Sequence, residues 1–411
     1  MEATVALVVE AVRSHFPALS RTVDGQPAAY LDGPGGTQVP KSVIDAMADF
    51  MRVGGSNHGG PFVTSRETDA VVVSARQAVA DLFGASPDEI AFGQNMTSLT
   101  LSVSRALGAT WMIGDNIVVT RLDHDANVWP WVIAARDAGV EVRWIDFDPD
   151  DGCRLQVEQV ADLVDRRTRL VAVTRASNAV GTVTDVRSLI GAAHVVGALS
   201  YVDAVHYSPH GLLDVAALGA DFLAASSYKF FGPHTGCLYG RTEVLDDVAA
   251  YKIRPAPDDP PGKWETGTQS FESLAGVTAA VDYIASLGDG DSRRERITSA
   301  METIGTYEAA LSERFLDGIA GLPGVRLYGR DSPDGRTPTF AVSVSGVHPD
   351  AVAAALGALG IFVWSGDYYA VEVMRRLGVA NQGGLVRIGF VHYNTLEEVD
   401  RVVAALGGLR T

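Results

Sequence analysis

The strongest constraint on the fold is an alternation of short apolar strands with helical segments between about residues 90 and 240. Such an alternation predicts a mostly parallel sheet covered by helices, the arrangement of α/β proteins. In these sheets ligands bind in the loops beyond the carboxyl ends of the strands. The expected strands are 117–120, 140–145, 170–174, 199–202, 222–225 and 237–239, and the expected helices are 97–107, 126–138, 156–165 and 185–196.

The rest of the chain predicts further helices and a loop outside this alternation, and a smaller α+β unit toward the C-terminus. Amphipathic helices are expected at 40–53 and 68–83, a short helix at 3–16, and an exposed Pro-rich loop at 254–263. We expect an N-terminal arm over residues 1–29 packing with the small unit, a large domain over 30–290 and a small domain over 291–411. The small unit contains expected strands near 324–328, 338–345, 361–364 and 385–390, and expected helices at 292–320, 349–359 and 395–408.

The composition fits a globular enzyme and argues against several classes of partner. The 411 residues are 47% hydrophobic and 20% charged, with a net charge of −17, so neither nucleic acid nor an anionic membrane is an expected partner. The first ten residues lack a basic region and are interrupted by Glu2 and Glu10, so no signal peptide or membrane span is expected. The two cysteines fit a reduced, cytoplasmic compartment and make no metal site.

Lys229 is the leading candidate for a catalytic residue. Only four of the 33 basic side chains are lysines, and Lys229 lies in a Ser/Gly/Pro-rich turn after an apolar strand. Arginine can neither lose its proton nor form an imine. Lysine does both, and its best-known imine is the Schiff base with pyridoxal 5'-phosphate (PLP).

The other groups that PLP requires occur at strand ends and at one helix start. Thr97 opens a helix that favours an anion, and His124 follows a strand where it could stack on the ring. Asn178 could bind the ring hydroxyl, and the carboxylate of Asp203 suits a cationic ring nitrogen. Each signal also has a simpler interpretation: a helix cap, a surface histidine, a turn, or a buried aspartate held by backbone amides.

These stretches, in this order, make the chain resemble the class V aminotransferase-fold PLP enzymes, and most of all the cysteine desulfurases. The resemblance begins at Tyr30-Leu31-Asp32-Gly33-Pro34-Gly35-Gly36-Thr37-Gln38 and ends at Tyr393-Asn394-Thr395-Leu396-Glu397-Glu398-Val399-Asp400. It implies a type I PLP-dependent transferase fold and a homodimer with a shared active site.

The resemblance also implies a role for each candidate residue. Lys229 would form the imine, Asp203 would pair with the ring nitrogen and His124 would stack on the ring. Asn178 and His206 would line the ring hydroxyl, although the family usually has Gln in place of His206. The remaining implied residues are Met96, Thr97, Ser226 and Tyr228 at the cofactor, Thr268 at the phosphate of the neighbouring subunit, and Arg387 at the substrate carboxylate.

One departure from the family pattern affects the expected chemistry. The segment that carries a mobile cysteine in cysteine desulfurases reads Val363-Trp364-Ser365-Gly366-Asp367-Tyr368-Tyr369-Ala370, with Tyr369 at the cysteine position. A persulfide requires a thiolate, and neither Cys153 nor Cys237 is an evident substitute. We therefore expect the subgroup that lacks the catalytic cysteine.

Several outcomes stay open for this chain. Removal of the α-proton from a small amino acid can lead to β-elimination, with C–S bond cleavage as one form, to epimerisation or to transamination. A catalytically degenerate scaffold on the same fold is the rival from another class. A nicotinamide-dependent dehydrogenase is excluded because Gly33-Pro34-Gly35-Gly36 lacks the Gly-x-Gly-x-x-Gly spacing.

Overall fold

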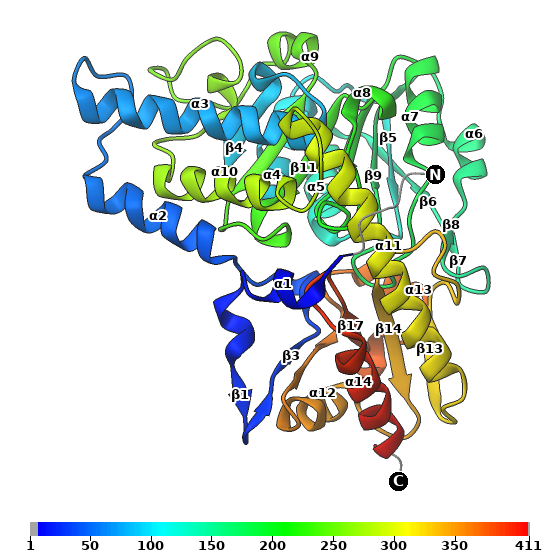
Figure 1. Cartoon of the computed structure of the whole chain (residues 1–411). Helices are drawn as coiled ribbons and strands as arrows, with labels where there is room; N and C mark the ends of the chain where they lie inside the picture. The colour runs from blue at the N-terminus through cyan, green and yellow to red at the C-terminus, as the bar shows by residue number, and fades with distance from the viewer. Residues whose placement is uncertain (1–6, 410–411) are drawn as a thin grey trace.

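The computed structural model describes residues 7–409 and contains a large and a small sheet that α11 connects (Figure 1). The helices are α1 (Val9–Arg13), α2 (Lys41–Val53), α3 (Val63–Phe83), α4 (Met96–Gly108), α5 (Trp129–Ala138), α6 (Val160–Leu163), α7 (Val186–Val195), α8 (Val215–Leu218), α9 (Thr242–Asp247), α10 (Phe271–Ala285), α11 (Arg293–Ala320), α12 (Pro349–Ala358), α13 (Val371–Arg376) and α14 (Leu396–Gly408). The strands are β1 (Thr22–Val23), β2 (Gln26–Pro27), β3 (Ala29–Tyr30), β4 (Ile90–Gly93), β5 (Asn116–Thr120), β6 (Glu141–Ile145), β7 (Phe147–Asp148), β8 (Arg154–Leu155), β9 (Thr168–Thr174), β10 (Leu199–Asp203), β11 (Phe222–Ser226), β12 (Gly236–Gly240), β13 (Val325–Tyr328), β14 (Thr339–Val344), β15 (Ile361–Phe362), β16 (Trp364–Gly366) and β17 (Leu385–Gly389).

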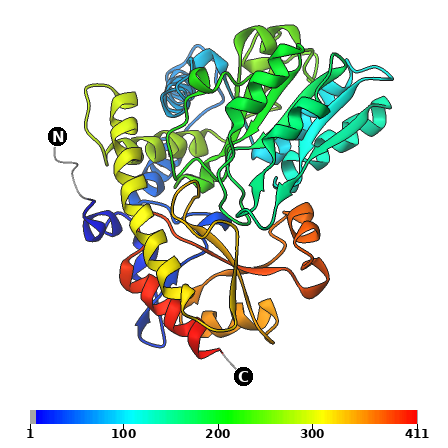
Figure 2. The same ribbon diagram turned by 90° about the vertical axis from the view of Figure 1, so that its right-hand side faces the viewer.

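The large sheet has seven strands in the order β4-β12-β11-β10-β9-β5-β6, and β12 runs against the others. Successive side chains of a strand point to opposite faces, so each strand serves two cores. In β5, Ile117 and Val119 pack with α4 and α5, whereas Val118 joins the core formed with α3, α7 and α10. Helices therefore cover both faces of a mostly parallel sheet, as the alternation predicted (Figure 2).

The expected strands and most expected helices are present within a few residues of their predicted positions. The sequence interpretation did not identify β4, which has only four residues, or α10, which is apolar around much of its circumference and lacks a clear periodicity. The expected helix 156–165 is reduced to α6 and a preceding 3₁₀ turn. The Pro-rich loop ends in buried Lys263, which donates to the Asp246 carbonyl.

The small sheet has the order β13-β14-β17-β16 and packs against α12, α14 and the second half of α11. The N-terminal segment contacts this part of the chain. β3 pairs in parallel with β15, and Arg13 donates to the Tyr393 carbonyl at 2.7 Å and lies 3.0 Å from a Glu398 carboxylate oxygen. The domain limits at residues 29/30 and 290/291 stay a prediction.

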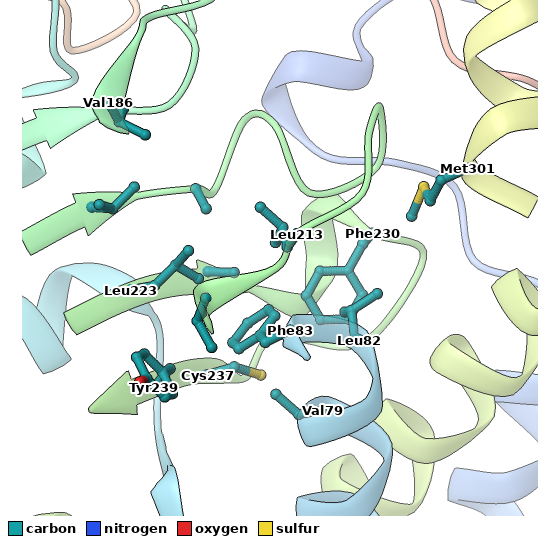
Figure 3. Packing of buried hydrophobic residues seen from close by; sticks show 14 of the residues in the cluster. Val79, Leu82, Phe83, Val186, Leu213, Leu223, Phe230, Cys237, Tyr239 and Met301 are labelled. Atoms are coloured by element: carbon teal, nitrogen blue, oxygen red, sulfur yellow. The ribbon is translucent and has the colours of Figure 1, made fainter. Parts of the chain in front are cut away.

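The core beneath the large sheet fixes the strands that lead to the site. Cys237 of β12 is fully buried in the same cluster as Val79 and Phe83 of α3 and Leu223 of β11 (Figure 3). Packing on this face holds β11 and β12 in register up to Ser226. The start of the turn after β11 that carries Lys229 is therefore held in place.

Within residues 7–409, every helix is too short or too polar to span a bilayer.

Candidate active site

A cavity of about 1160 Å³ lies beyond the carboxyl ends of β9, β10 and β11 and is closed on one side by the segment after β16. Its lining brings together every predicted site residue except Thr268, which is exposed and outside the cavity of its own chain. The predicted residues in the lining are Met96, Thr97, His124, Asn178, Asp203, His206, Ser226, Tyr228, Lys229 and Arg387.

Lys229 ends the 3₁₀ turn that follows β11, so its amine enters the cavity from the sheet edge. Its Nζ donates to the Pro34 carbonyl. Burial lowers the Lys229 pKa to about 7, with a further contribution from the cation of Arg387. A large share of this amine is therefore neutral near pH 7, as a nucleophile or a base requires.

Asp203 is the last residue of β10 and is only 4% exposed. Burial raises its pKa to about 6, while the Val205 N–H, 2.9 Å from Oδ1, and the cation of Lys229 act in the opposite direction. A buried carboxylate with one backbone donor keeps acceptor capacity on its cavity side. That environment favours a cationic partner.

His124 is held as a neutral ring. Its Nδ1 accepts the Ala126 N–H at 3.0 Å, which assigns the ring proton of the neutral form to Nε2. Burial, with Lys229 and Arg387, lowers the His124 pKa to about 3. The preceding Asp123 is buried, binds the Thr120 hydroxyl and accepts from Asn127 at 2.6 Å, so it anchors this loop.

α4 follows β4 along the chain, and its N-terminus lines the cavity. Asn95 caps the helix by accepting the Ser98 N–H at 2.9 Å, so the cap interpretation applies to Asn95 itself. Ser226 accepts the Met96 N–H at 2.9 Å, while Thr97 lies in the first turn at the cavity. The positive end of the helix and its hydroxyl favour an anion at this position.

Arg387 brings the small sheet into the cavity. It projects from β17 and donates through Nη1 to the Asn178 carbonyl at 2.9 Å, and its guanidinium carbon lies 4.5 Å from the Tyr368 ring centre. Asn178 donates through Nδ2 to the Tyr368 carbonyl at 2.9 Å, whereas its buried Oδ1 has no hydrogen-bond partner in the described part of the chain. Burial lowers the Arg387 pKa to about 10, which leaves it charged at neutral pH.

Tyr368 and Tyr369 both adopt left-handed backbone conformations, with φ of 56° and 57°. Two such non-glycine residues together cost about 2–6 kcal/mol, and neighbouring contacts stabilise them. The Asp125 N–H donates to the Tyr369 carbonyl at 2.6 Å, and the Tyr368 hydroxyl donates to the Leu385 carbonyl. The Tyr369 side chain is 72% exposed at the cavity mouth, its ring 5.5 Å from that of His124.

Neither cysteine lines this cavity. Cys153 and Cys237 are both fully buried, and burial raises the Cys153 pKa to about 12 and the Cys237 pKa further still. A thiolate is thus disfavoured at both positions.

Sequence reasoning did not assign roles to Asp123, Tyr368 or Asp32. Burial raises the Asp123 pKa to about 8 and the Asp32 pKa to about 6. The cations of Arg387 and Lys229 both lower the Asp32 pKa and so oppose the effect of burial, which shows that the Asp32 carboxylate lies near them. Asp32 lies in the stretch from Tyr30 to Gln38 quoted above and Asp123 directly precedes His124, but only their burial distinguishes them from surface caps.

Comparison with known proteins shows which family the chain belongs to. The model of the class-V aminotransferases matches residues 29–402. A cysteine desulfurase of Klebsiella pneumoniae (strain 342) is 35% identical over 97% of each chain, and an uncharacterized protein of Mycobacterium tuberculosis (strain CDC 1551 / Oshkosh) is 33% identical over 98% of this chain and all of its own. The chain belongs to the class V aminotransferase family.

Solved structures of family members share the whole fold. The apo structure of a cysteine desulfurase from Thermococcus onnurineus NA1 superposes with a TM-score of 0.88 at 30% identity and covers 97% of each chain. A cysteine desulfurase of Escherichia coli gives a TM-score of 0.83 at 27% identity, covering 97% of this chain and 98% of its own. The type I transferase fold and PLP as the cofactor follow from membership of this family.

The residues present fit PLP. The cavity contains an amine with a depressed pKa, a buried carboxylate with free acceptor capacity and a helix N-terminus with a hydroxyl. The buried Oδ1 of Asn178, which has no hydrogen-bond partner among residues 7–409, suits a ring hydroxyl that can donate to it. Burying polar and charged groups such as these lowers stability unless a ligand supplies their missing partners.

Proposed function

We propose that this PLP-dependent enzyme removes the α-proton of a small amino acid and completes a β-elimination, with C–S bond cleavage as the best-supported outcome. Membership of a family that includes cysteine desulfurases supports amino-acid chemistry. The observation that carries the elimination outcome is the cavity mouth, where Tyr369 and no thiol is present.

The roles assigned to the cofactor residues are part of the proposal. Lys229 would hold PLP through its amine, and Asp203 would pair with the ring nitrogen. His124 would stack on the ring, while Asn178 and His206 would face the ring hydroxyl. The residues proposed for the phosphate are Thr97, Ser226 and Tyr228, and Met96 is proposed as a further cofactor contact. When bound, PLP supplies an electron sink that makes the substrate α-proton acidic.

The remaining steps rest on side chains of the chain itself. Arg387 binds the substrate carboxylate with its guanidinium, which Asn178 and Tyr368 hold in position. Once the amino group of the substrate has replaced it on PLP, the Lys229 amine would be free, and it would accept the α-proton and hold it at Nζ. The phenol of Tyr369, at the mouth, cannot carry sulfane sulfur as a cysteine does.

The decisive experiment is incubation with cysteine under reducing conditions. Elimination consumes cysteine and water and releases pyruvate, ammonia and sulfide in equal amounts. Desulfuration would instead leave alanine together with a protein persulfide. Stoichiometric alanine with a persulfide on Cys153 or Cys237 contradicts the proposal. The Tyr369→Cys variant is the matched control, because it restores a thiol at the same position.

Transamination and epimerisation also begin with removal of the α-proton, so both stay open as alternatives to β-elimination. Transamination or epimerisation would be recognised by a keto-acid acceptor requirement or by solvent deuterium at Cα with inversion. A degenerate scaffold would retain no PLP after purification. The neutral Lys229 amine beside Asp203 and Arg387 supports an active enzyme over a scaffold.

The proposed assembly is a homodimer with a shared site. Thr268 is exposed and outside its own cavity, so a role at a phosphate requires a second copy of the chain. We place the enzyme in the cytoplasm, without nucleic acid or membrane as partner, on the acidic charge of −17 and the two unpaired cysteines.

A further inference from the structure

A second cavity of about 260 Å³ includes Thr337 in its lining, and Thr337 contacts His206 of the catalytic cavity. A volume of this size accommodates several water molecules at about 30 Å³ each. Its polar lining includes Tyr207, His210, Glu308, Ser312, Arg336 and Thr337, which come from the loop after β10, from α11 and from the segment before β14.

His206 connects the two cavities. It lines the catalytic cavity and is 4% exposed, while its Nε2 lies 3.0 Å from the Thr337 hydroxyl of the second cavity. Thr337 can donate its own proton to the Gly181 carbonyl at 3.3 Å and accept from His206. The Nδ1 of a neutral His206 ring is then an acceptor, and a second proton would make the ring a cation.

A buried acid–base pair stands directly behind His206. The rings of His206 and His210 meet edge to face with centres 5.3 Å apart. His210 Nδ1 lies 2.8 Å from Glu308 Oε2, and both side chains are 3% exposed. The second oxygen of Glu308 has no side-chain or backbone partner by hydrogen-bond geometry among residues 7–409.

We propose that His210 and Glu308 are positioning residues that set the proton on His206, so that the charge of Glu308 acts on the catalytic cavity through His206. The geometry allows one proton between His210 Nδ1 and Glu308 Oε2, and the His210 ring contacts the His206 ring directly. A glutamine in place of His206 would bind the same partners but could not titrate. The chain therefore has, at this position, a titratable group connected to a buried acid.

The surrounding charges give the direction of the effect. Lys229, Arg387 and His210 all lower the His206 pKa, and burial lowers it most. Glu308 is the carboxylate that pairs with His210, and His392 and Arg336 are the other groups near it. Burial raises the Glu308 pKa, and His210 acts in the opposite direction. Removing the Glu308 anion makes any cation at the cavity less favourable.

The test is a pH titration of the visible spectrum of the PLP-loaded enzyme. Glu308→Gln is expected to lower the spectral midpoint by about half a unit to one unit, the range for a unit charge over roughly 10–20 Å at an effective dielectric of about 20. The matched control is Glu398→Gln, which neutralises a buried glutamate bonded to Asn394 and Arg13 and should leave the midpoint in place.

The background of His206→Gln decides the route. There the shift caused by Glu308→Gln should be clearly smaller, because only the direct field of the Glu308 charge then acts on the cofactor. An equal shift in both backgrounds, or no shift in the natural one, overturns the proposal. The first readout rests on the proposed PLP-dependent function. A second uses the apoprotein, in which the unfolding free energies of Glu308→Gln and His206→Gln should be non-additive, and strict additivity also overturns the inference.

Discussion

Asp203 provides a stability test that requires no substrate. Its carboxyl is 4% exposed and accepts one hydrogen bond, from the Val205 N–H. Without a cation opposite, a charged carboxylate at this position opposes folding. We expect Asp203→Asn, which keeps the shape and the acceptor oxygen, to stabilise the apoprotein at neutral pH while weakening the binding of PLP.

The magnitude follows from the pKa. Burial raises the Asp203 pKa from 3.8 to about 6, so the folded chain binds this proton more tightly than the unfolded chain. The unfolding free energy therefore falls as pH rises from about 4 through 6. This rise of about two pKa units corresponds to about 3 kcal/mol. Above pH 6 the charged Asp203 therefore lowers the unfolding free energy of the apoprotein by this amount, and the asparagine variant avoids the loss.

The assay is denaturant unfolding of both apoproteins at pH 4, 5, 6 and 7. The unfolding free energy of the variant minus that of the natural protein should rise by up to about 3 kcal/mol between the lowest and the highest pH. The pH 4 comparison is the internal control, since Asp203 is then protonated in the folded chain and the two side chains are nearly isosteric. A difference in unfolding free energy that stays constant, or that falls as pH rises, would refute the assigned electrostatics of this site.

Three further outcomes test the rest of the site. Borohydride reduction of the loaded enzyme should fix the pyridoxyl group to Lys229, and peptide mapping that finds it on another of the four lysines contradicts the assignment. Acetylation of the Lys229 amine in the apoprotein should show a midpoint near pH 7 that rises in Arg387→Gln, because that variant removes a cation lowering the Lys229 pKa; a midpoint near 10 is the contrary result. Thr268→Ala should weaken PLP retention without changing the cavity of its own chain, and sedimentation of an active monomer would exclude the shared site.

The sequence alone was sufficient for the fold class and for the position of the candidate site. Short apolar runs between helical segments located the strands, and parallel strands bring their carboxyl ends to one edge of a sheet. His124, Asp203 and Lys229 follow different strands of that sheet and line one cavity. The opposite direction of β12 was not predictable in this way, since a short apolar strand has the same pattern in either direction.

Only the tertiary structure decided the electrostatics. Asp123 and Asp203 are both aspartates near strand ends, yet burial raises the pKa of Asp123 to about 8 and that of Asp203 to about 6. The connection from Arg387 to Asn178 spans 209 positions, and the pair of His210 and Glu308 spans 98. Desolvation and charge pairing depend on which distant segments exclude water from a group, and local sequence patterns do not contain that information.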